Sequence, residues 1–124
     1  MKNQQHDVRI QNEGDGEFLL LCPRCGGDYL HHGAVVIKDR PEDQDGVCTI
    51  VGYQQISQQP IDKDQCEGRR DSLFVRFMCE FCGERKGYFW LEIQQHKGRT
   101  FLAWKNPVGI TKDLQLKKAP KKQQ

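Results

Sequence analysis

The sequence has few apolar residues and no long apolar run. Only 36% of its 124 residues are hydrophobic, and the mean hydropathy is −0.78. No segment approaches the roughly 20 apolar residues that a membrane-spanning helix needs. The start of the chain also lacks the basic and then apolar pattern of a secretory leader. We therefore expect a soluble, cytoplasmic protein of one domain, without a membrane partner, whose small core needs a further cross-link.

The sequence also lacks helical periodicity and catalytic motifs. No window places apolar residues at the 3.6-residue spacing of an amphipathic helix. Ser57, Ser72, His31 and His96 stand outside any nucleophile or phosphate-loop motif. These absences indicate an all-β protein that is not an enzyme and has no small-molecule substrate.

Cysteine, by contrast, occurs six times, and four of the six form two matched pairs. Cys22-Pro23-Arg24-Cys25-Gly26 and Cys79-Glu80-Phe81-Cys82-Gly83 are each C-x-x-C followed by glycine. Two intervening residues let both sulfurs of a pair face one point, and glycine can adopt the positive φ that tightens the turn. This spacing is typical of zinc sites. It predicts one structural Zn²⁺ per chain, bound by Cys22, Cys25, Cys79 and Cys82.

Redox chemistry and a disulfide framework are the alternatives for these pairs. A redox C-x-x-C usually precedes a helix whose N-terminus lowers the pKa of the thiol. Here Gly26, Gly27 and Asp28 lead into a β-rich segment instead, and the second pair would be left unexplained. Disulfide frameworks belong to oxidising compartments, and we expect this chain to stay in a reducing one.

The other two cysteines and two adjacent histidines are predicted to lie outside the metal shell. Cys48 lies in a strand-like run and is interpreted as a small buried apolar residue. Cys66 lies in a polar stretch and is interpreted as an exposed free thiol. His31 and His32 point to opposite faces if their segment is a strand, so at most one could reach the metal. We expect one histidine to be packed or hydrogen-bonded and the other to be solvent-exposed.

Six strands are predicted where β-forming residues lie between turn signals. They cover residues 18–21, 29–38, 47–53, 73–78, 87–95 and 100–104. The glutamine-rich stretch 54–71 is predicted to be a long loop, because it has few apolar residues. The expected fold is therefore all-β, with antiparallel hairpins around one four-cysteine zinc and a hairpin-plus-loop insert between the cysteine pairs.

Composition divides the chain into three segments. Residues 1–16 are polar and turn-rich, and we predict a disordered N-terminal segment. Residues 17–104 form the zinc-binding β domain. Residues 105–124 carry six lysines and one aspartate, a net charge of +5 that leaves −3 for the rest of the chain. We predict a basic disordered tail, which is either a solubilising end or a phosphate-binding arm.

Strand alternation predicts two sheet faces with different roles. The inward positions are Leu73, Val75, Phe89 and Leu91. The opposite face then carries Phe74, Arg76, Tyr88 and Trp90. Exposed aromatics with an arginine make a candidate interface for a protein or for unstacked bases, although the insert could instead cover this face as a second small core. Arg69 and Arg70 in the long loop are two further candidates for partner binding.

The paired cysteine turns resemble those of zinc-ribbon proteins, in which two C-x-x-C turns on adjacent hairpins bind one structural zinc. The wider pattern adds Tyr29-Leu30-His31-His32 and Arg40-Pro41-Glu42-Asp43 to the first turn. Over roughly residues 18–104, this pattern resembles small uncharacterised zinc-ribbon proteins of phages and bacterial mobile elements. The resemblance implies zinc at the four paired cysteines and no catalytic residue. The long insert and the acidic body depart from a minimal ribbon.

Together these observations predict a non-enzymatic zinc-binding module. We expect it to act as a small adaptor or regulator through protein–protein binding; a phage or mobile-element modulator or inhibitor of host machinery is one variant. The alternative is a nucleic-acid-binding ribbon that uses the basic tail and the aromatic sheet face. The net charge of −3 outside the tail favours the protein partner.

Overall fold

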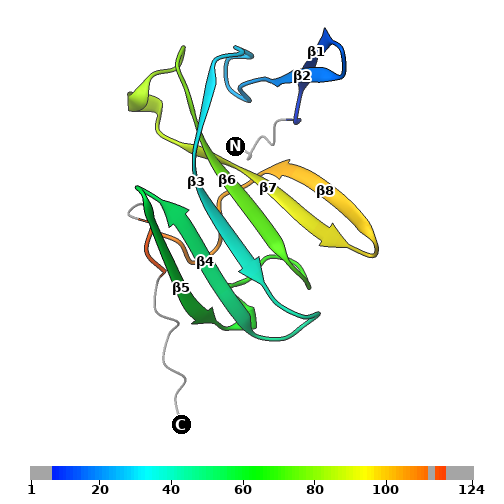
Figure 1. The fold of residues 1–124 in the computed structure, drawn as a ribbon, viewed down its shortest axis with the longest axis vertical. Coiled ribbons are helices and arrows are strands. Elements are labelled where there is room, and N and C mark those ends of the chain that lie inside the picture. Colours follow the sequence, from blue (N-terminus) through cyan, green and yellow to red (C-terminus); the bar gives the residue numbers. More distant parts are fainter. Residues whose placement is uncertain (1–6, 112–113, 117–124) are drawn as a thin grey trace, which may run out of the picture.

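The computed structural model describes residues 7–111 and 114–116 of the chain, and every strand pairing in this part is antiparallel. The expected all-β fold class is confirmed (Figure 1). A small sheet pairs β1 (Ile10–Gly14) with β2 (Glu17–Leu20). The second sheet contains β3 (Leu30–Asp39), β4 (Gly46–Gly52), β5 (Gln55–Ile61), β6 (Ser72–Cys79), β7 (Phe89–His96) and β8 (Arg99–Trp104).

The six strands of the large sheet lie in the order β5-β4-β3-β6-β7-β8. The central pair, β3 and β6, lies between the hairpin formed by β4 and β5 and the hairpin formed by β7 and β8 (Figure 1). The insert therefore extends the same sheet. Two short 3₁₀ helices, η1 (Lys63–Gln65) and η2 (Glu84–Lys86), lie in the connections.

One face of this sheet, which we call the covered face, forms the main hydrophobic core. Ile50, Val36 and Phe74 are direct cross-strand neighbours on β4, β3 and β6, and each is at most 7% exposed. Trp90 on β7 belongs to the same core. Leu114 is buried against these side chains, because the C-terminal segment runs back across the sheet (Figure 1).

The opposite face, which we call the open face, carries two rows of side chains that no described segment covers along most of their length. The first row crosses all six strands from β5 to β8 and contains Ile56, Val51, Val35, Val75, Leu91 and Trp104. The second row contains Gln58, Thr49, Ile37, Leu73, Ile93 and Leu102. At the Trp104 end, Trp104 contacts Phe77 and Phe89 on the same face, and the buried cysteines Cys22 and Cys79 pack against this aromatic group.

The predicted inward face is therefore wrong along most of the sheet, although Phe89, which was also predicted to point inward, is 7% exposed. Phe74, Arg76 and Trp90 do share a face, but they are between 0% and 9% exposed. Leu73 and Val75 lie on the open face and are only half-buried. Alternation identifies the residues that share a face, but the segments that pack against the sheet decide which face is buried.

The prediction of a disordered tail over residues 105–124 is wrong for its first part. Leu114 is 8% exposed, and Ile110 and Leu116 pack against the main core and pair with each other as an isolated β-bridge. Apolar residues in this segment are too widely spaced to show a periodic pattern, yet each finds a place on the covered face. The lysines between residues 117 and 122 lie outside the described residues.

The prediction of disorder over residues 1–16 is wrong for residues 10–14. This stretch forms β1, whose Ile10 pairs with Leu20 and whose Gln11 pairs with Leu19. Its five residues are all exposed, so its sequence shows no apolar face that would have predicted a strand. Residues 1–6 lie outside the described part of the chain.

The predicted long loop over residues 54–71 contains strand β5. The turn before it places Tyr53 and Gln54 at φ of 52° and 63°, between the paired residues Gly52 and Gln55. Two consecutive residues with positive φ are typical of a type I′ hairpin turn, which usually has Asn-Gly at these positions. Because Tyr-Gln is an unusual sequence for such a turn, the hairpin was not predicted.

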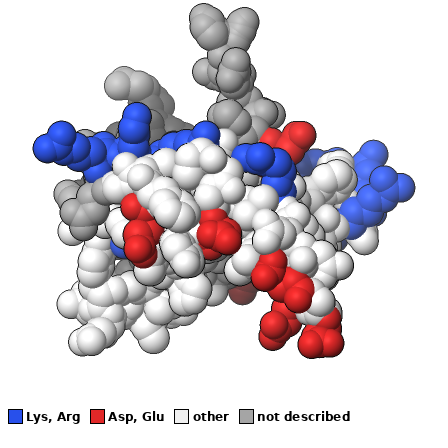
Figure 2. Space-filling model, turned by 90° about the horizontal axis from the view of Figure 1, so that it is seen from above, with Lys and Arg blue, Asp and Glu red and all other residues white. Residues whose placement is uncertain are grey.

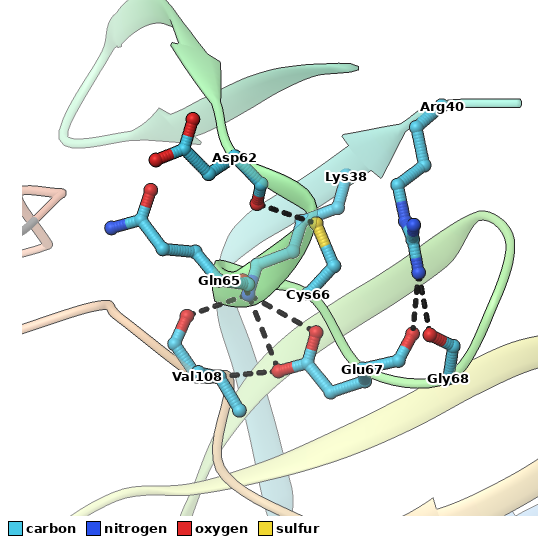
Figure 3. Close-up of polar contacts among 8 residues, drawn as sticks. All are labelled: Lys38, Arg40, Asp62, Gln65, Cys66, Glu67, Gly68 and Val108. Carbon is cyan, nitrogen blue, oxygen red and sulfur yellow. Dashed lines mark hydrogen bonds and ion pairs between the residues drawn. The ribbon is translucent and has the colours of Figure 1, made fainter. Parts of the chain in front are cut away.

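The rest of this stretch is held against β3 by buried basic side chains (Figure 3). The Lys38 ammonium is fully buried and donates to the Gln65 carbonyl at 2.7 Å, the Glu67 carboxylate at 3.0 Å and the Val108 carbonyl at 2.6 Å. Arg40 donates to the backbone carbonyl of Gly68 at 2.6 Å. These contacts join the loop and the C-terminal segment to the covered side of the sheet, so removing the Lys38 charge would leave several buried acceptors unpaired.

Candidate metal centre

The two cysteine turns adopt nearly the same backbone geometry at one end of the large sheet. The first follows β2, and the second begins at Cys79, the last residue of β6. Gly26 and Gly83 have φ of 77° and 80°, and their N–H groups donate to the carbonyls of Cys22 at 2.9 Å and Cys79 at 3.0 Å. The positive φ expected of both glycines is thus present, and it closes each turn around its sulfurs.

The turns bring four thiols together as the spacing predicts. The Sγ atoms of Cys22, Cys25, Cys79 and Cys82 all lie within 4.8 Å of one another. The Cys22 and Cys82 sulfurs are 3.9 Å apart, and those of Cys25 and Cys79 are 3.6 Å apart. A tetrahedral ion with metal–sulfur bonds of about 2.3 Å separates its ligands by about 3.8 Å. The donor set therefore fits a four-coordinate metal ion, whereas a disulfide would need sulfurs about 2 Å apart.

Backbone N–H groups also point at the sulfurs. Arg24 donates to the Cys22 sulfur and Gly27 to the Cys25 sulfur, both at 3.3 Å. Cys82 donates to the Cys79 sulfur at 3.4 Å. Such bonds stabilise thiolates and hold ligands in position around a metal.

The crowding of four thiols opposes their ionisation without a cation. Burial and the neighbouring thiols raise the pKa of Cys82 to about 12, and burial chiefly raises the pKa of Cys79. Burial also acts against ionisation of Cys22, but backbone N–H groups of Cys25 and Arg24 outweigh it and lower the pKa of Cys22. The cluster thus has one thiol suited to ionise first, while a bound cation is needed to hold four thiolates together.

A small aromatic core connects the cluster to the sheet. Cys22, Cys79 and Phe89 are buried together, with Phe77 and Trp104 packed against them. The Phe89 and Trp104 rings meet edge to face at 5.3 Å between centroids. The cysteine turns therefore cover the Trp104 end of the open face, and the order of this end depends on the cluster.

The remaining cysteines and histidines lie outside the cluster, as expected, but with one correction. Cys48 is 1% exposed, and burial raises its pKa to about 11. Cys66 is not an exposed thiol: it is half-buried against the main core and its sulfur donates to the Asp62 carbonyl at 3.4 Å (Figure 3). His31 is exposed, with its Nε2 2.8 Å from a Glu80 carboxylate oxygen, and His32 is exposed as well.

The residues predicted to bind a partner are not brought together as one open surface. Phe74 and Trp90 are in the main core. Arg76 is 8% exposed, and its guanidinium stacks on the half-exposed ring of Tyr88 at 4.1 Å. In the loop, Arg69 donates to the Asp43 carboxylate at 2.6 Å and is 3.1 Å from Glu42. Only Arg70 remains exposed without a described partner.

The structure reveals an exposed aromatic pair that was not predicted. Tyr29 and Phe81 are 57% and 61% exposed and stack at 5.2 Å between ring centroids. Phe81 lies between the two cysteines of the second turn, and its ring passes so close to Gly27 that a Cβ there would be 2.3 Å away. The position of an aromatic residue inside a C-x-x-C was the only sequence signal, because Tyr29 is distant along the chain.

Comparison with protein-family models, with curated proteins and with solved structures found no match to this chain. The resemblance to zinc ribbons stays a prediction, supported by the four-cysteine cluster alone. Within the described residues, no helix has the length and apolar character required to cross a bilayer.

Proposed function

We propose that this protein is a non-enzymatic binding module, held together by one structural Zn²⁺ and acting through contact with a protein partner. The observation that carries the proposal is the cluster of four sulfurs at near-tetrahedral spacing. Four thiolates in tetrahedral geometry are typical of structural zinc, with iron–sulfur chemistry as the main alternative. A fourth protein ligand closes the coordination shell, which leaves no position for a catalytic water.

The stacked pair of Tyr29 and Phe81 is the surface that we assign to the partner. Phe81 lies within the second cysteine turn, and the Glu80 N–H of that turn donates to the Tyr29 carbonyl at 2.9 Å, so the backbone beneath the pair is held next to the cluster. Rigid exposed aromatic side chains are frequent anchors of protein interfaces, because they bury a large area with little loss of entropy. An adaptor or regulator would use such an anchor; modulation of host machinery is the form that the zinc-ribbon resemblance suggests.

Local charge favours a protein partner over nucleic acid. Asp28 and Glu80 are the chain neighbours of Tyr29 and Phe81, and acidic side chains next to the stacking surface would repel phosphates. Figure 2, which looks down on the end with the cysteine turns, shows both acidic and basic side chains on this side of the molecule and no uniformly basic surface. The aromatic sheet face that the nucleic-acid alternative required is mostly buried.

Metal analysis tests the zinc centre. Protein purified without added zinc is expected to contain about one equivalent of zinc per chain. Cys79→Ser should lose the metal and the ordered Trp104 environment, while Cys66→Ser, which alters a cysteine outside the cluster, should keep the zinc. A well-folded sample with no metal, or one that contains iron and sulfide, would reject the structural zinc.

Affinity capture tests the partner surface. We expect nuclease-treated lysate of the native host to yield a protein bound to the wild type and to Phe101→Ala, a variant of an exposed aromatic elsewhere on the sheet. The double variant Tyr29→Ala/Phe81→Ala should lose this protein while keeping its zinc. Capture that disappears with nuclease, or that weakens steeply with salt, would instead support nucleic-acid binding.

A further inference from the structure

The open face is too apolar to be an ordinary solvent-facing surface. Its first row is apolar on all six strands, and its second row is apolar on four of them. Ile56 is 72% exposed, Leu102 is 53% exposed and Val51 is 39% exposed. A contiguous apolar surface of this kind on a small protein marks a contact site.

The two rows also contain no charged side chain. The nearest charge within the strands is Asp39, which lies at the end of β3 beyond Ile37. A partner that covers both rows therefore does not remove any charge of this chain from water. Charged side chains on the partner would find no opposite charge in the two rows. An uncharged, apolar surface is more typical of contacts between identical subunits than of transient contacts with other proteins.

The ends of the chain outside the described residues are poorly suited to cover this face. Residues 1–6 read MKNQQH and residues 117–124 read KKAPKKQQ, so Met1 is their only large apolar side chain. The C-terminal segment up to Leu116 already packs on the covered face.

The size of the face suits sheet-on-sheet packing. Six strands about 4.8 Å apart, each contributing a length of about five residues, present on the order of 500 Å² per molecule. Two such faces bury about 1,000 Å² together, which reaches the lower limit of a specific interface. Two identical sheets also have the same twist, so they can pack aligned at about 10 Å.

We propose that a second copy of this chain covers the open face, and that two copies form a β-sandwich with two-fold symmetry. Two-fold symmetry places the same surface on both subunits, so each apolar row meets an apolar row of the other copy. The metal-binding turns lie at the edge of this interface beside Trp104, and the pair of Tyr29 and Phe81 stays available to another protein. The inference does not depend on the proposed function.

The mass of the zinc-loaded full-length protein in solution tests this proposal. We expect light scattering and sedimentation to give twice the chain mass of 14.4 kDa at micromolar concentrations. The double variant Val51→Lys/Leu102→Lys should weaken the dimer at least about 100-fold, because it buries unpaired charges at the interface. Ile56→Lys alone should weaken it too, and a residue this exposed can change without harm to the fold.

Ile10→Lys is the matched control, because Ile10 is 57% exposed but lies on β1 outside the large sheet. It should leave the dimer unchanged. Circular dichroism and zinc content identify any variant that fails to fold. A wild-type protein that stays monomeric up to several hundred micromolar overturns the proposal. A dimer that survives both open-face variants, or that Ile10→Lys dissociates, overturns it as well.

Discussion

Both faces of the large sheet carry apolar side chains, but their surroundings differ. On the covered face, Phe74 and Val36 are fully buried beneath the chain's own C-terminal segment. On the open face, their strand neighbours Val75 and Val35 are only half-buried, and Ile56 and Leu102 at its edges are exposed. One face is thus covered by the chain's own segments, whereas among the described residues the other is covered only where the cysteine turns pack against Trp104.

This difference shows that a sheet face becomes a core where other segments of the chain pack over it, and that apolar residues in the strand are not sufficient. The covered face even includes buried polar groups, Lys38 and Glu92, whereas the two open-face rows contain no charge. Lys38 is tolerated because the loop and the C-terminal segment supply acceptors for it. Hydrophobicity along a strand is therefore a poor guide to which face a small sheet buries.

Removal of the C-terminal segment that packs on the covered face is expected to have the largest effect on stability. A chain that ends after Pro107 loses the packing of Ile110, Leu114 and Leu116 and the carbonyl of Val108 that accepts from Lys38. Burial of a leucine side chain stabilises a fold by about 1.5–3 kcal/mol when it is complete, as for Leu114, and by less when it is partial, as for Ile110 and Leu116. We therefore expect the free energy of unfolding to fall by about 4 kcal/mol, a large part of a small domain's stability. Denaturant unfolding should show this directly.

The matched control is a chain that ends after Leu116. It removes only the lysine-rich end, which carries no large apolar side chain, and we expect its unfolding midpoint to equal that of the full-length chain. If the chain that ends after Pro107 is equally stable, the C-terminal segment does not cover the core and the distinction between the faces fails.

Substitutions at two adjacent residues of β6 allow the stability contributions of the two faces to be compared within one strand. Phe74→Ala empties a fully buried site and should cost about 3–5 kcal/mol. Val75→Ala removes a half-buried side chain from the open face and should cost about 1 kcal/mol. Thermal and urea unfolding should be measured at the lowest practical protein concentration, so that association does not add to the second value. Equal losses would mean that both faces are cores within one chain.

The four-cysteine cluster was largely predictable from the sequence, because the geometry of each turn depends on residues that are close together in the chain. Two residues between the cysteines and one glycine after them specify the geometry of each turn. The stacked pair of Tyr29 and Phe81 was not predictable, since it depends on how the two turns meet.

The strands were predictable in part, and their errors have definite causes. The β3, β4, β6 and β7 segments are rich in β-branched and aromatic residues and were expected close to their observed positions. Strand β5 was missed because Gln55, Ser57 and Gln58 give it no apolar alternation and its turn has an unusual sequence. Strand β1 is fully exposed and has no such alternation either.

The choice of the buried face could not be derived from alternation, because each face of β6 carries large apolar side chains and the buried one also carries Ser72 and Arg76. Phe74 and Val75 each lie on a plausible core face, and the decision depends on Leu114, forty residues later in the chain. That leucine stands in a polar, lysine-rich segment, where composition predicts disorder. Contacts distant in sequence that involve single apolar residues leave no pattern for sequence reasoning to detect.

The smallest expected effect concerns the buried carboxylate of the covered face. Glu92 is 2% exposed, its Oε2 has no partner among the described residues, and Lys105 is 3.9 Å from its Oε1. Burial raises the pKa of Glu92, so its ionisation weakens the fold above that pKa and costs nothing once the group is protonated. We therefore expect Glu92→Gln to raise the melting temperature at neutral pH by a few degrees, on the order of 1 kcal/mol. The gain should shrink as the pH falls through the raised pKa towards the usual carboxyl range.

Glu67→Gln is the opposite control, because Glu67 accepts from the buried Lys38 and its loss should destabilise the fold. A lower melting temperature for Glu92→Gln at neutral pH, or a gain that does not change with pH, would show that Glu92 is paired in solution and that the covered face carries no unfavourable charge.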